Sequence, residues 1–115
     1  MKRLTALSLL AGLLVVAPHA FARTGSQAST TVRVTAKEFK FTLSRKSAPH
    51  GVVIFKVTNK GKIKHDFKIA GKKTPLIAAG KSATLKVTLK KGSYKYICTV
   101  PTHAALGMKG TFKVT

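Results

Sequence analysis

The sequence predicts an all-β domain, folded as a β-sandwich or barrel. Apolar and polar residues alternate with a period of two over several short segments, which is the pattern of half-buried strands. Turn-forming Gly, Pro and Asn residues separate these segments at intervals of about 8–12 residues, as in sandwiches and barrels. Beyond single turns near 76–79 and 104–106, the chain after the first 22 residues shows no convincing helical periodicity.

The expected strands follow one another along the chain. In most of them, apolar residues on one side alternate with lysine, arginine or threonine on the other, which keeps the outer faces and edges soluble. Residues 52–57 are nearly all apolar, so both faces of that strand should be partly covered. The turns between strands fall at 48–51, 59–61, 71–73 and 91–92. The strand segments are Thr31–Val34, Phe39–Leu43, Val52–Val57, His65–Ile69, Leu85–Leu89, Tyr94–Cys98 and Thr111–Val114.

The N-terminus predicts an export signal. Lys2 and Arg3 precede an apolar run, and Ala20-Phe21-Ala22 has the small-x-small pattern of a cleavage site. The run is shorter than a membrane span of about 20 residues, although an uncleaved anchor is the alternative. The expected division is a signal peptide at 1–22, a flexible linker at 23–30 and a folded domain at 31–115. The domain would be periplasmic or secreted, with no transmembrane segment after cleavage.

The chain is strongly basic. It has 22 Lys and Arg residues, only two acidic residues (Glu38 and Asp66), and a formal charge of +20. Loss of Lys2 and Arg3 with the signal would lower this charge to +18. Because the basic residues are scattered, they predict a solvated basic face on a folded body. We expect this face to attract an acidic redox protein or an anionic surface, and solubility in an unusual ionic environment is the alternative. Specific nucleic-acid binding is not expected, because no aromatic-basic motif accompanies the charge.

The only cysteine, Cys98, lies close to two other soft ligands. His103 and Met108 follow it in a segment that also contains Pro101 and Gly107. In an exported chain, a lone cysteine is an intermolecular partner, a free thiol or a metal ligand. Taken singly, each of these residues is more often an ordinary core or loop residue. Their clustering in one Gly/Pro loop favours a metal site.

A histidine from elsewhere can complete the ligand set. His65 lies near the start of a different strand, whereas His50 lies in a Pro-His-Gly turn and is not expected to bind metal. Two imidazoles, a thiolate and a weak axial thioether are the ligands of blue-copper electron-transfer centres. Zinc also binds thiolate and imidazole, but its sites usually lack a thioether. The sequence therefore predicts one copper ion, Cu(I) or Cu(II), bound by His65, Cys98, His103 and Met108.

The same residues carry a family resemblance. Tyr94-x-Tyr96-x-Cys98-(x4)-His103-(x4)-Met108-x-Gly110, followed by a closing strand, resembles the ligand loop of the cupredoxins, which include plastocyanin, pseudoazurin and azurin. Upstream, Asn59-x-Gly61 and His65-Asp66-Phe67 resemble the first-histidine region of that family. The resemblance covers residues 31–115. It implies a Greek-key β-sandwich of about seven to eight strands, with a type 1 copper site at one end and Met108 as the axial ligand.

Two features depart from the family pattern. The Cys98-to-His103 spacing matches azurin, whereas the His103-to-Met108 spacing matches plastocyanin. Asp66 replaces the asparagine whose side chain, in the family, ties the first-histidine loop to the cysteine loop. We expect Asp66, Asn59 and Thr99 to support the ligands. Backbone N–H groups at 64–66 or 99–100 should hydrogen-bond the thiolate and tune the reduction potential.

A site with three strong ligands and one weak ligand has no open position for a substrate. We therefore expect a non-enzymatic, monomeric carrier of single electrons. The resemblance implies a solvent-facing edge of His103 as the electron exit, and an apolar patch within a basic surround suits brief docking. A copper-delivery protein is the first alternative, and a basic module that binds polyanions or membranes is the second. The expected patch residues are Val100, Pro101, Ala104, Ala105 and Leu106.

Overall fold

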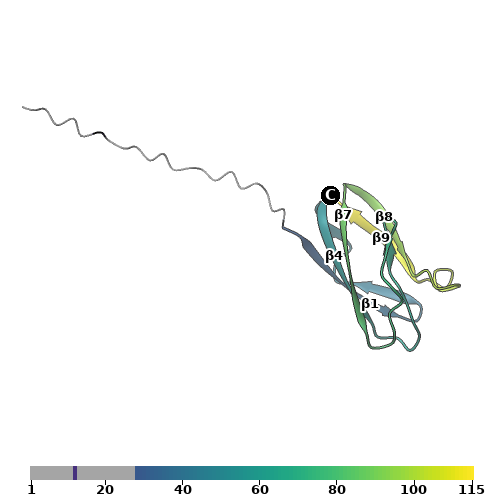
Figure 1. Ribbon diagram of the computed structural model, residues 1–115. Helices are drawn as coiled ribbons and strands as arrows, with labels where there is room; N and C mark the ends of the chain where they lie inside the picture. Colours follow the sequence, from purple (N-terminus) through teal and green to yellow (C-terminus); the bar gives the residue numbers. More distant parts are fainter. Residues whose placement is uncertain (1–11, 13–27) are drawn as a thin grey trace, which may run out of the picture.

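The computed structural model describes Gly12 and residues 28–115. The rest of the predicted signal peptide (1–22) and residues 23–27 of the predicted linker lie outside the described residues. Strand β1 begins at Thr30, the last residue of the predicted linker. The described chain forms two β-sheets packed as a sandwich (Figure 1), which confirms the predicted fold class. The strands are β1 (Thr30–Lys37), β2 (Lys40–Leu43), β3 (Ser47–Ala48), β4 (Gly51–Asn59), β5 (Lys68–Ile69), β6 (Lys72–Lys73), β7 (Ser82–Leu89), β8 (Gly92–Ile97) and β9 (Lys109–Val114).

The two sheets interleave segments that are distant in the sequence. The first sheet has the order β2-β1-β4-β7 and the second has the order β3-β9-β8-β5-β6. Strand β1 runs parallel to β4, and β3 runs parallel to β9, while the other pairs are antiparallel. Such parallel neighbours require connections that cross from sheet to sheet, as expected of a Greek-key sandwich. Within the described residues, the chain forms no helix with the length and apolar character needed to cross a membrane.

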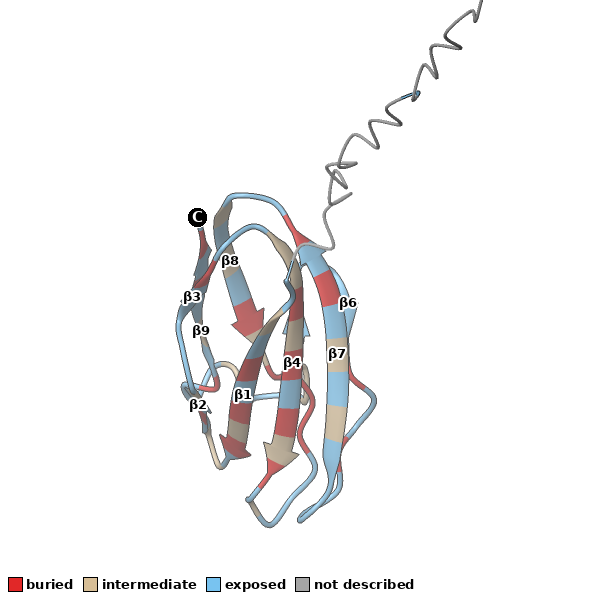
Figure 2. Ribbon diagram, turned by 90° about the vertical axis from the view of Figure 1, so that its left-hand side faces the viewer, coloured by how far each residue is buried: buried red, intermediate tan, exposed pale blue. Residues whose placement is uncertain are grey.

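The core lies between the sheets. Alternate residues of β1 and β4 are buried, and the residues between them are more exposed (Figure 2). This follows from strand geometry, since successive side chains point to opposite faces. Aromatic rings from both sheets meet in the core, with neighbouring ring centroids 5.1–5.8 Å apart. These rings belong to Phe41, Phe55, Phe67, Tyr96 and Phe112.

Three local predictions are wrong in detail. The sequence predicts a break at 71–73, but the chain turns at Ala70–Gly71, where both residues have positive φ, and Lys72–Lys73 pair with β5. Phe39 is predicted to lie within a strand, but it belongs to the turn between β1 and β2. The predicted strand at 65–69 is regular only at Lys68–Ile69, because His65 forms a single bridge with Ile77 instead.

One end of the sandwich collects the loops that carry the predicted ligands. Parallel strands β1 and β4 end side by side, since Ala36 pairs with Asn59. Strand β8 ends at Ile97, which pairs with Lys109 at the start of β9. The connections that leave these strand ends are 38–39, 60–67 and 98–108. They contain all four predicted ligands.

Candidate metal centre

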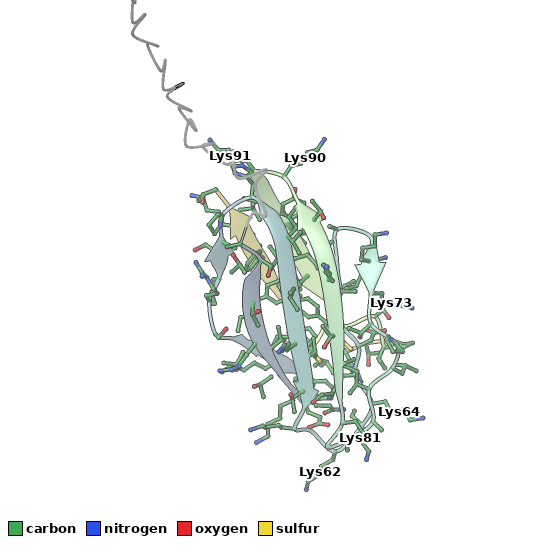
Figure 3. All side chains as sticks on the ribbon, turned by 60° about the vertical axis from the view of Figure 1, so that its left-hand side comes forward. Lys62, Lys64, Lys73, Lys81, Lys90 and Lys91 are labelled. Carbon is green, nitrogen blue, oxygen red and sulfur yellow. The ribbon has the colours of Figure 1, made fainter. Side chains whose placement is uncertain are left out.

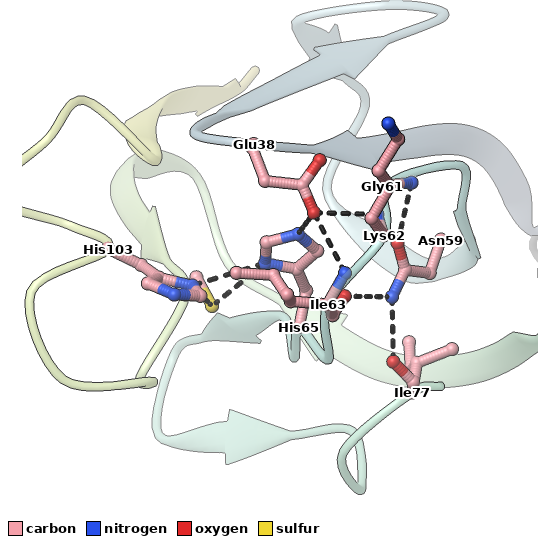
Figure 4. Close-up of polar contacts among 9 residues, drawn as sticks. Glu38, Asn59, Gly61, Lys62, Ile63, His65, Ile77 and His103 are labelled. Carbon is pink, nitrogen blue, oxygen red and sulfur yellow. Dashed lines mark hydrogen bonds and ion pairs between the residues drawn. The ribbon is translucent and has the colours of Figure 1, made fainter. Parts of the chain in front are cut away.

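Three predicted ligands lie together and are buried. The Nδ1 atom of His65 is 3.2 Å from Nδ1 of His103, and Sγ of Cys98 is 3.9 Å and 3.5 Å from these two nitrogens (Figure 4). A point equidistant from the three atoms lies about 2.1 Å from each, in the range of bonds between a transition metal and imidazole or thiolate ligands. The three atoms can therefore bind one metal ion in a trigonal arrangement.

The loop between β8 and β9 positions three of the four ligands. Cys98 directly follows β8, and its N–H donates to the carbonyl of Met108 over 3.1 Å. The N–H of Met108 donates in turn to the carbonyl of His103, and the N–H of His103 to the carbonyl of Val100, both over 3.1 Å. The Met108 side chain is fully buried. These backbone bonds close the loop on itself and hold Cys98, His103 and Met108 at fixed positions.

Asp66 joins the His65 segment to the cysteine loop. Its Oδ1 accepts the backbone N–H of Thr99 over 2.6 Å, and its Oδ2 accepts the Thr99 hydroxyl in a very short bond. Asp66 is almost fully buried. The structure thus places Asp66 in the bridging position that asparagine occupies in the family that the chain resembles.

Asn59 fixes the loop that precedes His65. Its amide Nδ2 donates to the carbonyls of Ile63 and Ile77, and its Oδ1 accepts the N–H of Gly61, each over 2.8 Å. Ile77 also exchanges two backbone hydrogen bonds with His65, of 3.2 Å and 2.7 Å. Asn59 and the bridge to Ile77 therefore set the position of the first histidine.

Glu38 is the site residue that sequence reasoning missed. Its Oε1 accepts the backbone N–H groups of Lys62 (2.7 Å) and Ile63 (2.9 Å) and lies 3.3 Å from Nε2 of His65 (Figure 4). The sequence holds one signal that could have found it, because Glu38 is one of only two acidic residues in a chain of charge +20. The next residue, Phe39, places its ring edge-on against His103, with centroids 5.0 Å apart.

Burial and hydrogen bonding set the protonation of the site. Burial raises the pKa of the Cys98 thiol, while the backbone N–H groups of Asp66 and Val100 lower it. These donors lie in the two stretches where the sequence predicts them. Burial lowers the pKa of His103, and the electrostatic effect of the neighbouring His65 ring lowers it further. The backbone N–H of Ile63, assisted by further hydrogen bonds, lowers the pKa of Glu38 to about 2. At neutral pH, metal binding must displace the thiol proton of Cys98.

The surroundings of His103 match the expectation only in part. His103 is 5% exposed, so any solvent-facing edge is a small part of the residue. Around it, the predicted patch residues Pro101, Ala105 and Leu106 are exposed, whereas Val100 and Ala104 are half-buried. His50 is remote from the site, and its Nδ1 lies 3.1 Å from the carbonyl of Thr115.

Comparison with known proteins identifies the family. Residues 26–115 match the copper binding proteins of the plastocyanin/azurin family. The chain belongs to this family. The cupredoxin resemblance is therefore confirmed, and copper is the ion that the buried imidazole and thiolate ligands are built to bind. His65, Cys98, His103 and Met108 are arranged as a type 1 copper site. A comparison with curated protein sequences gives no match.

Solved cupredoxin structures share the fold. Auracyanin from the photosynthetic bacterium Roseiflexus castenholzii is 24% identical, with a TM-score of 0.66 over 76% of this chain and 98% of auracyanin. Rusticyanin from Thiobacillus ferrooxidans is 23% identical, with a TM-score of 0.66 over 76% of this chain and 77% of rusticyanin. A multicopper oxidase is 21% identical, with a TM-score of 0.57 over 75% of this chain and 41% of the oxidase. This fold thus occurs in a multicopper oxidase as well as in auracyanin and rusticyanin.

Proposed function

We propose that this protein is an exported blue-copper protein that carries single electrons between redox partners. The observation that carries the proposal is the enclosure of the ligand set. His65, Cys98 and Met108 are fully buried, and His103 is 5% exposed. The protein therefore shields the point that the ligand atoms share from solvent. Export rests on the N-terminal sequence pattern.

The protein's contribution to electron transfer is a fixed ligand geometry. A type 1 copper ion supplies a one-electron Cu(I)/Cu(II) couple. The Asp66–Thr99 bonds, the Asn59 bonds and the closed 98–108 loop restrain the ligands independently of the metal. Ligands that move little between the two oxidation states require little rearrangement of the surroundings. This supports electron transfer, and not catalysis, as the role of the centre.

The electron exit that we propose is the exposed apolar patch around His103. Leu106 is 58% exposed, and Pro101 and Ala105 beside it are also exposed. The chain has a formal charge of +20, which favours an acidic redox protein as the partner. Electrostatic attraction raises the rate of encounter, and a small apolar contact keeps the complex short-lived.

Copper delivery is the competing role. Delivery requires an incoming ligand to reach the metal, and the burial of three ligands in the described structure opposes such access. A direct test loads the protein with copper, cycles it with ascorbate and hexacyanoferrate(III), and adds an apo copper-binding peptide as an acceptor. We expect repeated full oxidation and reduction with the copper retained. Transfer of copper to the peptide faster than the redox cycle would contradict electron transport.

The exit is tested with two variants of matched exposure. Leu106→Glu places a negative charge in the His103 patch, and Leu76→Glu places the same charge on a residue outside the patch that is 57% exposed. Both charges repel hexacyanoferrate(III), but we expect the Leu106→Glu protein to react more slowly because its charge lies at the exit. Equal rates for the two variants would place the exit elsewhere.

A further inference from the structure

Both acidic residues of this basic chain lie at the metal centre. Asp66 ties the His65 segment to Thr99, and Glu38 contacts the His65 ring itself. In the described part of the chain, the Glu38 carboxylate forms no ion pair with a lysine or arginine, although the protein has 22 of these residues. Its partners are instead two backbone N–H groups and an imidazole. Pairing with a surface lysine or arginine therefore does not explain the position of Glu38.

The carboxylate contacts the ring nitrogen that does not face the metal position. Nε2 of His65 lies 3.3 Å from Glu38 Oε1, while Nδ1 lies on the side of His103 and Cys98. An ionised carboxylate can only accept a hydrogen bond, so Nε2 must carry the N–H that donates to it, and the neutral imidazole then has its lone pair on Nδ1. Ligating histidines commonly donate their second N–H to a carboxylate, which fixes the tautomer and ring orientation and makes the ligand more basic.

The Glu38 carboxylate is itself held in place. The N–H groups of Lys62 and Ile63 bind the same oxygen that contacts His65, and the Asn59 side chain secures the loop that presents them (Figure 4). Gly61 leaves room for the carboxylate, because a Cβ atom at this position would lie 2.5 Å from Glu38 Oε1. The glutamate, the loop and the histidine thus form one connected unit.

We propose that Glu38 is a positioning residue of the copper centre, which fixes the Nε2–H tautomer of His65 and lowers the reduction potential. The second effect follows from charge, since a fixed negative charge next to a ligand stabilises Cu(II) more than Cu(I). This inference rests on the proposed function only in requiring a copper centre. The contrasting possibility is that Glu38 merely caps the 60–64 loop.

The test compares copper-loaded wild-type protein with Glu38→Gln, which keeps the shape of the side chain and removes its charge. We expect Cu(II) affinity to fall about 10–100-fold, as for other residues that support metal ligands, and Cu(I) affinity to fall less. Each tenfold difference between the two losses raises the one-electron reduction potential by about 59 mV. Cyclic voltammetry measures the potential, and competition with chelators measures both affinities.

Two further variants separate the contact from simpler effects. Gly61→Ala displaces the carboxylate but keeps its charge on the protein, so it should shift the potential in the same direction. Thr88→Lys is the control for net charge. It changes the charge by the same amount as Glu38→Gln, on an exposed residue that pairs with Val52 at the opposite end of β4 from Asn59. It should leave the potential nearly unchanged.

The outcomes distinguish this inference from the proposed function. If Glu38→Gln keeps an intact blue centre and shifts the potential no more than Thr88→Lys, Glu38 is only a loop cap and the inference is wrong. If the wild type forms no blue centre, the proposed function fails instead. If Glu38→Gln does not fold, nitrogen–proton NMR of the wild-type Cu(I) protein tests the contact between Glu38 and His65 directly. The Nε2–H proton of His65 should exchange slowly with water, and rapid exchange would overturn the contact.

Discussion

At the residue scale, buried polar side chains hold the ligands. Asp66 connects the segment of the first histidine to the cysteine loop, and Asn59 connects the loop before that histidine to Ile77. Each side chain makes more than one hydrogen bond, so its removal leaves backbone groups without partners. Such groups are costly when they are shielded from water. The hydrogen bonds of these surrounding residues therefore fix the positions of the ligands.

We predict that the bridge of Asp66 depends on its acceptor atoms more than on its charge. Asp66→Ala leaves the Thr99 N–H without its acceptor and should lower the free energy of unfolding by about 1–3 kcal/mol. Asp66→Asn keeps one acceptor oxygen and should cost clearly less. Urea unfolding of the apo-proteins measures both changes. Equal losses for the two variants would show that the bridge contributes through charge.

The ligands are evident from local sequence patterns, but the contact between Glu38 and His65 is not. Cys98, His103 and Met108 are rare residue types that cluster within one loop, so composition alone draws attention to them. Glu38 lies 27 positions before His65 and meets it only because β1 and β4 end side by side. No local sequence pattern predicts this contact between residues 27 positions apart. The one signal in the sequence is global, since Glu38 is one of only two acidic residues in the chain.

At the element scale, the core anchors the two ligand-bearing segments. Phe67 follows Asp66 and packs on Phe55 and Tyr96, with centroid distances of 5.1 Å and 5.4 Å. Tyr96 in turn lies two residues before Cys98. The same aromatic cluster thus fixes the approach of both segments to the site. The turn between β1 and β2 covers the site from the other sheet, with Glu38 on His65 and Phe39 on His103.

We predict that two core phenylalanines differ in their effect on copper. Phe67→Leu and Phe112→Leu both truncate fully buried rings that pack on Phe55, so each should lower the free energy of unfolding by about 0.5–3 kcal/mol. Only Phe67→Leu should also weaken Cu(II) binding, because Phe67 carries the segment of His65. Competition titrations of the two variants check this. A similar loss of affinity in Phe112→Leu would mean that the core acts on the site as a whole.

The sequence pattern predicted the long strands, but neither the short strands β3 and β6 nor the true length of β5. Strands β1, β7, β8 and β9 follow runs in which apolar and polar residues alternate, and β4 follows a dense apolar run. The two-residue strands β3, β5 and β6 are too short to show a period. They exist because a neighbouring strand or a tight turn offers hydrogen-bond partners. These partners are set by the tertiary structure and cannot be inferred from the local sequence.

At the scale of the whole molecule, charge is the dominant feature. The chain has a formal charge of +20, and lysines lie at both ends of the described sandwich. Lys62, Lys64 and Lys81 lie at one end, and Lys90 and Lys91 lie at the other (Figure 3). Lys64 directly precedes His65, and Lys62 lies three residues before it. Charge close to the electron exit should act more strongly on a docking partner than charge one sandwich length away, because salt screens electrostatic forces over about 8–10 Å.

We predict that reaction with an anionic oxidant depends on the lysines near the site. The rate of oxidation by hexacyanoferrate(III) should fall as salt increases, because screening weakens the attraction. Lys62→Gln with Lys64→Gln should reduce this rate more than Lys90→Gln with Lys91→Gln, which removes the same charge from the far end. Stopped-flow absorbance measures the rates. Equal reductions would show that only net charge matters.

The most direct test of the copper centre is titration of the apo-protein with Cu(II), followed by absorption and electron paramagnetic resonance. The buried Cys98 thiolate with two imidazoles should produce an intense blue charge-transfer band that saturates at one copper per chain. The Cys98→Ser protein should lack this band while keeping its β-sheet circular dichroism. A wild-type protein that stays colourless with Cu(II), or a Cys98→Ser protein that turns equally blue, would contradict the account.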